Sequence, residues 1–542
     1  MLFDVLYIYN IRFKLKGNLP LKNTHELELQ KEIDELKIEN QQLKQQLATL
    51  KKLHFGPKTE KKITVYPDAE MSLFDEVEVE AKQSIKEPAL EEETVVKSHK
   101  RKKASKGKTS VKKLLELLPK ENIENRYIDL PEDEKICKQC GELLYPIGVD
   151  HVRDEVVYTP AQIKVIRYYQ RSYECRQCSS TSEKKIIVKP AIPRPVIDHS
   201  FASPSAVSHV IMQKYFYALP LYRQEQEWKQ MGLPLHRATL ANWVMKVSDV
   251  WLTPMYNRMH QLLLQESCLH ADETPVQVLQ EKGRKNTTKS YMWLYSSGEF
   301  EPQYPIRLFE YSATRKGENA VKFLEGYHGY LHTDDYGGYN QFAKASRCLC
   351  WAHARRKFVD AKPTGVDDLT NTLVQKGLDY IGKLFQIESE LKELTSEERK
   401  KLRLEKERPL LDAFWEWAEE SRYKVLPKSK ISMALNYALT NREMLETYLN
   451  DGRCAISNNL AENSIRPFTV GRKNWLFSGS PKGADASAKV YSIIETCKAN
   501  GLNVEKYLNY IFKELPKEEH PTHVDVLDTY MPWNPKVQEL CK

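Results

Sequence analysis

Residues 266–358 alternate between short apolar runs and polar breaks, and this order restricts the fold more than any other segment does. Runs of this length, rich in β-branched and aromatic residues, are typical of strands. We expect strands at 268–272 leading into 275–279, and at 291–295, 306–311, 329–333 and 348–351, with a helical segment before 329 and a helix at 352–358. Three strands, a helix, a strand that ends in an acid, a further strand and helices follow the order of a ribonuclease-H-like α/β fold. Residues 365–450 are polar and almost wholly helical, so we expect a helical insertion there.

Three acidic residues stand in dense local contexts in and beyond this segment: Asp272 in HADETP, Asp334 in LHTDDYG and Glu462 in SNNLAEN. Three carboxylates from separate segments are what a protein needs to hold two divalent metal ions against a phosphodiester. Mg²⁺ prefers such oxygen ligands and keeps positions for water and phosphate. We expect Asp272 within a strand, Asp334 at the end of another, and Glu462 on a helix that Pro467 ends or kinks.

Each acid also has an ordinary structural interpretation, because a lone Asp after a strand is usually a turn or cap residue. Glu273 and Asp335 are direct neighbours and rivals. Adjacent strand residues face opposite sides, so one member of each pair should point away from the metals. Spacing alone does not choose between Asp334 and Asp335.

Basic and aromatic residues follow Glu462 in the run from Arg466 to Ser480. Arg466, Arg472 and Lys473 are expected to contact DNA phosphates, and Trp475 to stack on an unpaired base. The alternative is a core aromatic pair beside a solvated basic turn. In either case we place Phe477 in the core.

Four of the ten cysteines form two CxxC pairs, Cys137 with Cys140 and Cys175 with Cys178. Two such turns make a tetrahedral Zn²⁺ site, and four thiolates close it against catalysis. Strands expected at 156–158 and 165–169 favour a zinc ribbon. A redox CxxC would need only one pair. The other six cysteines show no disulfide-like spacing, which is typical of a reducing cytoplasm.

Residues 203–247 are expected to form three helices, at 204–217, 222–231 and 237–247. The turn around Gly232 resembles that of a helix-turn-helix, which would place Arg237 against DNA. Such a turn also joins helices in many proteins that never bind DNA.

A leucine heptad, Leu29, Leu36, Leu43 and Leu50, predicts a coiled coil near the N-terminus. Asn40 at an a position fixes register, and opposite charges at the flanking positions favour a parallel homo-oligomer. An amphipathic helix that packs on its own chain is the alternative. Segregated acidic and basic blocks then predict a charged linker.

The chain is too long for one core and should hold several domains. Its net charge of +8 is modest, so DNA binding must come from local patches. No stretch is apolar enough to span a membrane. The full prediction is a multidomain α/β protein: an unassigned extension at 1–24, coiled coil 25–56, charged linker 57–115, zinc-binding domain 116–200, helical region 201–262, core first part 263–364, insertion 365–451, core second part 452–500 and C-terminal segment 501–542.

The motifs resemble those of the transposases of the insertion sequence 66 family, which belong to the DDE group. The resemblance runs from residue 25 to 534 and includes the zipper, the CxxC pairs, HADETPVQVL at 270–279, CWAHARRKF at 350–358 and the 458–480 block. It implies a transposase with a catalytic triad of Asp272, Asp334 and Glu462 that binds Mg²⁺ or Mn²⁺. Asp335 stands where the family usually has glycine, so the resemblance implies that Asp334 is the second acid of the triad.

The resemblance also implies partners and a location. The expected partners are the element's terminal inverted repeats, target DNA and accessory proteins of the same element, and the expected location is the bacterial cytoplasm, at the nucleoid. Two alternatives remain: a catalytically inactive transposase-derived DNA-binding protein, and a nuclease of the same fold without strand transfer.

Overall fold

The computed structural model describes residues 162–174, 187–188, 191–342, 346–363, 369–370 and 372–542. The predicted coiled coil, the charged linker and all four cysteines of the predicted zinc site lie outside these residues. The chain divides into two units, and the elements below belong to the unit that contains residues 164–542.

A two-stranded antiparallel pair, β1 (Tyr173–Glu174) and β2 (Ile187–Val188), precedes the main body of the unit. The prediction of a strand at 165–169 is wrong, because these residues have no regular secondary structure. Their large side chains are exposed, Tyr169 by 86%. A strand needs a partner ladder and a surface to pack against; the described residues give this segment neither.

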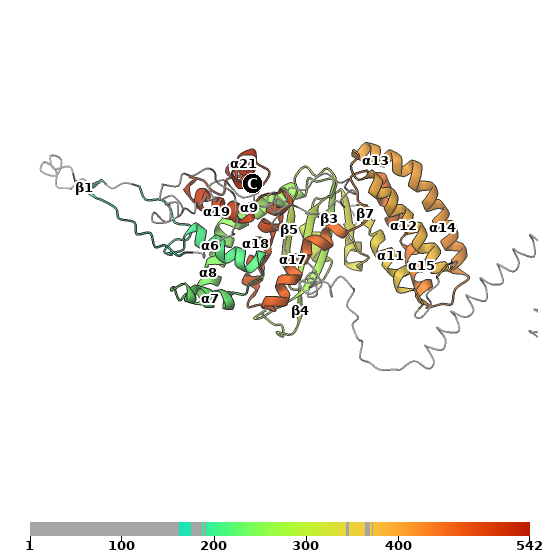
Figure 1. The fold of residues 1–542 in the computed structure, drawn as a ribbon, viewed down its shortest axis with the longest axis horizontal. Helices are drawn as coiled ribbons and strands as arrows, with labels where there is room; N and C mark the ends of the chain where they lie inside the picture. Colours follow the sequence, from blue (N-terminus) through green and yellow to red (C-terminus); the bar gives the residue numbers. More distant parts are fainter. Residues whose placement is uncertain (1–161, 175–186, 189–190, 343–345, 364–368, 371) are drawn as a thin grey trace, which may run out of the picture. The chain divides into compact units, whose positions relative to one another are not determined.

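The main body is built on a mixed sheet with the strand order β5-β4-β3-β6-β7 (Figure 1). β3 pairs antiparallel with β4, and β4 with β5, whereas β6 runs parallel to β3 and β7 parallel to β6. The short β8 pairs in parallel with the end of β3. The strands are β3 (Cys268–Val278), β4 (Lys289–Ser297), β5 (Arg307–Ser312), β6 (Tyr330–Thr333), β7 (Ser346–Leu349) and β8 (Phe477–Ser478), with α10 (Glu318–Phe323) before β6 and the 3₁₀ turn η5 (Gly337–Gln341) after it.

Two long helices contact the sheet, α17 (Asn459–Trp475) on β3 and β4 and α18 (Pro481–Ala499) on β5. The first four residues of β3 are all buried, as expected of a strand covered on both faces. Side chains of α18 also protect the edge strand: Ser492 accepts from Phe309 N at 2.7 Å and Thr496 from Arg307 N at 2.9 Å. These bonds occupy edge groups that could otherwise pair with another chain.

The three helices predicted at 203–247 are present, and short π-helical turns extend the first and the third of them. Gly232, with φ +90°, lies in the turn between α7 and α8. The helices of this region are α6 (Pro204–Ile211), η3 (Met212–Phe216), α7 (Leu221–Gln230), α8 (Arg237–Val247), η4 (Ser248–Leu252) and α9 (Thr253–Leu263). They contact α18 and the C-terminal helix α19 (Val504–Glu514), which is followed by η8 (Leu515–Lys517), α20 (Val524–Thr529) and α21 (Pro535–Cys541).

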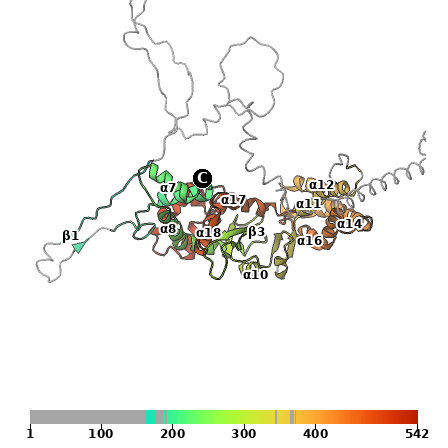
Figure 2. The same cartoon turned by 90° about the horizontal axis from the view of Figure 1, so that it is seen from below.

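The helical insertion follows β7 and α11 (Trp351–Asp360), and both views show its helices grouped beside α11 (Figures 1 and 2). Its buried residues form one cluster with Trp351 of α11 and with Cys348 and Leu349 of β7. Trp351 is fully buried there, and its indole donates to Leu445 O at 2.8 Å. The insertion therefore packs on the sheet through β7 and α11. Its elements are α12 (Leu373–Leu391), α13 (Ser396–Leu402), η6 (Arg403–Glu407), α14 (Arg408–Arg422), α15 (Lys430–Thr440), α16 (Arg442–Glu446) and η7 (Thr447–Asn450).

Candidate active site

Asp272 lies in the middle of β3, between β4 and the end of β6. One oxygen of its carboxylate accepts from Glu273 N at 2.8 Å. Burial is the largest of the causes that raise the pKa of this carboxyl to about 8, and the charges of Glu273, Asp334 and Glu462 contribute to that rise. The three predicted acids are therefore close enough to interact electrostatically.

Asp334 follows the last residue of β6, as predicted. Its carboxylate accepts from Tyr336 N at 3.0 Å, which closes a tight turn. Its neighbour Asp335 is exposed and faces the insertion, where it accepts from Asn441 Nδ2 at 3.4 Å. The charge of Asp334 contributes to the raised pKa of Asp272. This interaction favours Asp334, and the choice between the two acids stays a prediction.

Glu273, the other rival, is held by a cation. Arg315 Nη2 lies 2.6 Å from its Oε1, and the hydroxyl of Tyr339 donates to its Oε2 at 2.7 Å. The side chain is only 1% exposed. Burial raises the pKa of Glu273, whereas the bonds from Tyr339 and Arg315 lower it. Both carboxylate oxygens of Glu273 are therefore committed to its own partners.

Glu462 lies in the first turn of α17, and Asn458 fixes the start of this helix against β3. The amide of Asn458 donates to Ala271 O at 2.9 Å, and its Oδ1 lies 2.9 Å from His270 Nδ1. Its backbone N–H donates to Cys350 Sγ at 3.2 Å. Asn458 is 2% exposed, so each of these bonds satisfies a buried group.

Two side chains of α11 lie against Glu462, His353 with Nε2 at 3.7 Å and Arg356 with Nη2 at 3.9 Å. Cys350, His353 and Glu462 place one donor atom each within 4.8 Å of one another. Among the described residues, the three acids do not form so tight a group. Asn458, His353 and Arg356 were not predicted as site residues, although the CWAHARRKF motif held the signal: a histidine and arginines directly after a strand.

One prediction around Glu462 is wrong in part and another is wrong. The sequence predicts that Pro467 ends or kinks its helix, and it does not end it, because the helix continues to Trp475; a kink at Pro467 stays a prediction. Proline removes one backbone bond, but buried residues on both sides of it, Ile465 and Phe468, hold the helix on the sheet. Phe477 is not in the core, because it is 44% exposed on the terminal strand β8.

The predicted DNA-contacting residues have different surroundings. Arg466 and Lys473 are exposed on α17, and Arg237 is exposed at the start of α8, over the ring of Tyr222. Arg472 is bound to β3, with Nη1 donating to Thr274 Oγ1 at 2.8 Å and to Pro275 O. Trp475 is half-buried, with its ring edge-to-face against Phe468 at 5.5 Å.

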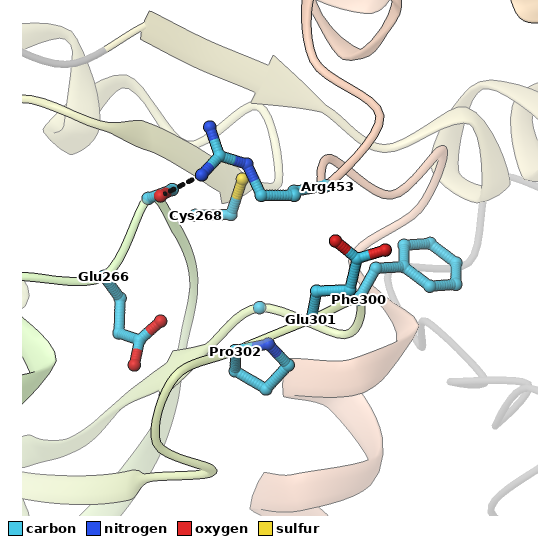
Figure 3. A pocket seen from close by; sticks show the side chains of 8 residues that line it. Glu266, Cys268, Phe300, Glu301, Pro302 and Arg453 are labelled. Carbon is cyan, nitrogen blue, oxygen red and sulfur yellow. Dashed lines mark hydrogen bonds between the residues drawn. The ribbon is translucent and has the colours of Figure 1, made fainter. Parts of the chain in front are cut away.

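A small pocket lies elsewhere, at the start of β3 (Figure 3). Glu266, Cys268, Phe300 and Arg453 are among its lining residues, and none of the three acids is. Arg453 Nη1 donates to Ser267 Oγ at 2.6 Å, and Figure 3 shows Arg453 beside Cys268. The candidate active site is therefore separate from this pocket.

Comparison with known protein families decides the relationship. The family model described as "Transposase IS66 family" matches residues 199–486, which is more than half of the chain and includes all three acids. The chain belongs to the IS66 transposase family. The predicted resemblance is thereby confirmed.

Three further models of IS66 elements match the chain. The "zinc-finger binding domain of transposase IS66" matches 134–179, which contains all four predicted zinc ligands. "Transposase C of IS166 homeodomain" matches 42–123, and the "IS66 C-terminal element" matches 492–533. The mixed sheet and its helices fall within the transposase match.

Two proteins similar to this chain come from Sinorhizobium fredii. "Uncharacterized protein y4jD" is 26% identical over 512 residues, 92% of this chain and 95% of that protein. "Uncharacterized protein y4hP" is 29% identical over 425 residues, 74% of each chain. In the described residues of this IS66 family member, no helix has the length and apolar character to cross a membrane.

Proposed function

We propose that this transposase binds the ends of its insertion sequence, cleaves DNA there and joins the freed 3′ end to target DNA. One observation carries the proposal: Asp334 and Glu462, which are 128 residues apart in sequence, both raise the pKa of the half-buried Asp272 carboxyl. Mutual repulsion of three nearby carboxylates costs folding stability, and a DNA-binding protein without catalysis gains nothing from that cost.

The strand order supports a ribonuclease-H-like core. Three antiparallel strands are followed by two that run parallel to the first, and Asp272 and Asp334 come from the adjacent strands β3 and β6. Glu462 returns to this edge on α17 after the helical insertion. Fold alone does not determine activity, so the proposal depends on the acids.

The acids fit two divalent cations, Mg²⁺ or Mn²⁺. The repulsion at Asp272 calls for a cation, and Glu462 Oε1 is buried without a hydrogen bond from any described residue. Carboxylate oxygens are the ligands that these hard ions prefer. When bound, such ions activate an attacking water or 3′-hydroxyl and stabilise the leaving oxygen.

The remaining side chains of the site position and bind. Arg315 and Tyr339 hold Glu273 in place, so that Asp272 is the acid presented by β3. Asn458 fixes the helix of Glu462 to the same strand. Arg466, exposed one turn beyond Glu462, can receive a DNA phosphate.

The other regions supply DNA binding and assembly in this proposal. Cys137, Cys140, Cys175 and Cys178 hold a structural Zn²⁺, the N-terminal heptads make a homo-oligomer, and α7 with α8 and Arg237 contacts the terminal inverted repeats. Accessory proteins of the same element join the complex at the bacterial nucleoid. The core is divided by the insertion at 365–451.

The test uses the full-length protein, Mg²⁺ and DNA that carries the inverted repeats flanking its gene. Nicked ends and joined products together support the proposal. Nicks without joining indicate a nuclease, and end binding without nicks indicates an inactive descendant. Either of the last two results overturns the proposal.

A further inference from the structure

Three of the six cysteines in the described residues lie close together beside β6, although they come from three distant segments of the chain. Cys268 begins β3, Cys348 lies in β7 and Cys454 precedes α17. Their exposed fractions are 3%, 1% and 0%. The sulfur atoms of Cys268 and Cys454 are 3.6 Å apart.

A histidine completes the group. His332 of β6 is the register partner of Cys348, and donor atoms of His332, Cys348 and Cys454 all lie within 4.8 Å of one another. We propose that Cys268, Cys348, Cys454 and His332 form a buried site for a thiophilic transition metal, most simply Zn²⁺. This site is distinct from the two CxxC pairs and does not depend on the proposed catalytic function.

One sulfur–sulfur distance suits tetrahedral thiolate coordination. With Zn–S bonds of about 2.3 Å, two sulfurs of a tetrahedron are about 3.8 Å apart, and Cys268 and Cys454 are separated by 3.6 Å. Cys268 is not within 4.8 Å of both His332 and Cys348, so an ion held by Cys454, Cys348 and His332 would have to draw the Cys268 thiol inward. Three sulfurs and one imidazole nitrogen are an established ligand set for structural zinc.

The surroundings of His332 match those of a metal ligand. Its Nδ1 lies 3.1 Å from Leu269 O, so the ring donates there and its Nε2 carries the lone pair. A backbone carbonyl on the second nitrogen is the usual outer partner of a metal-bound histidine. Nε2 now accepts from Ala455 N at 3.0 Å, and metal binding would exchange that bond for the ion.

Two arginines lie near the thiols, and each is also paired with a carboxylate. Arg403 donates to Cys454 O at 2.9 Å and is paired with Glu388. Arg453 has its pKa raised by its bonds to Asp451 and, to a smaller extent, by the charges of Cys268 and Cys454. Cys268 and Arg453 also line the pocket of Figure 3, so one of the four proposed ligands lies at the wall of this pocket.

The site would join the segments that carry the catalytic acids. Cys268 is four residues before Asp272, His332 two before Asp334, and Cys454 eight before Glu462. A metal here would fasten β3, β6, β7 and the start of α17 together. Ordinary packing of small thiols is the competing interpretation.

Metal analysis of the full-length chain separates the two. In a C137S/C140S background, which removes the CxxC site, we expect about one equivalent of zinc per chain. Adding Cys348→Ser or Cys454→Ser should remove that zinc, whereas Cys497→Ser, a buried thiol in α18, should leave it. A background chain without zinc, or zinc that survives both cluster substitutions, overturns the proposal.

A second measurement guards against misfolding of the variants. A strong chelator should lower the thermal unfolding midpoint of the C137S/C140S chain itself, because removal of a structural metal removes folding free energy. Co²⁺ loaded into that chain should give the charge-transfer absorption of thiolate ligands. An unfolding midpoint that the chelator does not change, or a Co²⁺-loaded chain without the charge-transfer absorption, contradicts the proposed metal site.

Discussion

The side-chain amide of Asn458 donates a 2.9 Å hydrogen bond to the backbone carbonyl of Ala271, the residue directly before Asp272. Asn458 is also four residues before Glu462, at the start of the same helix. One buried amide thus connects the first and third acids of the proposed triad, which are 190 residues apart in sequence.

Asn458→Ala should therefore impair catalysis more than folding. The change removes the bonds to Ala271 and His270 and frees the start of α17. We expect DNA cleavage to fall about tenfold or more, equal to about 1.4 kcal/mol of transition-state stabilisation, with a higher Mn²⁺ concentration needed for half-maximal rate. Asn436→Ala is the matched control, since among the described residues that amide donates to Ser432 of its own helix and to no acid of the triad. Equal cleavage rates and equal Mn²⁺ dependence in both variants would show that Asn458 does not position the site.

Asp272→Asn should stabilise the metal-free protein while abolishing cleavage. The pKa of this carboxyl rises from 3.8 to about 8 on folding. Well below pH 3.8 the Asp272 carboxyl is protonated in both the folded and the unfolded chain. As the pH rises from there towards 8, the carboxyl ionises in the unfolded chain but stays largely protonated in the folded chain, so the folded state loses stability. One pKa unit corresponds to about 1.4 kcal/mol.

Thermal unfolding without divalent cations, between pH 4 and 8, checks this prediction. The melting temperature of Asp272→Asn should exceed that of the unsubstituted chain by a margin that grows with pH. The exposed Asp249→Asn should show no such trend. A variant that melts lower at pH 8 would mean that Asp272 is not under repulsion.

Asp334→Asn and Asp335→Asn should differ sharply in activity. Asp334 acts on the pKa of Asp272, whereas Asp335 faces Asn441 of the insertion. We expect metal-dependent nicking to disappear in the first variant and to stay within about threefold in the second, less than 1 kcal/mol of transition-state stabilisation. Nicking assays on end DNA at matched protein concentration measure the difference; loss in Asp335→Asn alone would reverse the assignment.

Arg466→Ala and Arg472→Ala should separate DNA contact from structure. Arg466 is exposed, so its loss should weaken DNA binding and lower the salt dependence by about one ion. Arg472 donates to Thr274 and Pro275 of β3, so its loss should lower the melting temperature. Binding titrations at several salt concentrations, together with thermal unfolding, test both halves.

The sequence predicts most strands of the sheet correctly, because a local apolar pattern is enough to mark a buried strand. β3, β4, β5 and β6 lie where apolar periodicity predicted them, and β6 ends directly before Asp334. The family resemblance is confirmed by the match at 199–486.

The errors and omissions depend on contacts that no local pattern encodes. Pro467 stays inside a helix because distant packing holds both sides of it, and Phe477 is exposed because β8 pairs only with the far end of β3. The CWAHARRKF motif held a signal for His353, but no local pattern named its partner Glu462 or the partners of Asn458, because only the folded chain brings them close.

Calorimetric titration of Mn²⁺ into the full-length protein tests the proposed triad most directly. The unsubstituted chain and Asp335→Asn should bind the ion alike at the catalytic site. Asp272→Asn, Asp334→Asn and Glu462→Gln should each weaken that binding by about tenfold or more, because each removes a charged oxygen ligand. Unchanged Mn²⁺ affinity in any of these three variants would contradict the shared metal site.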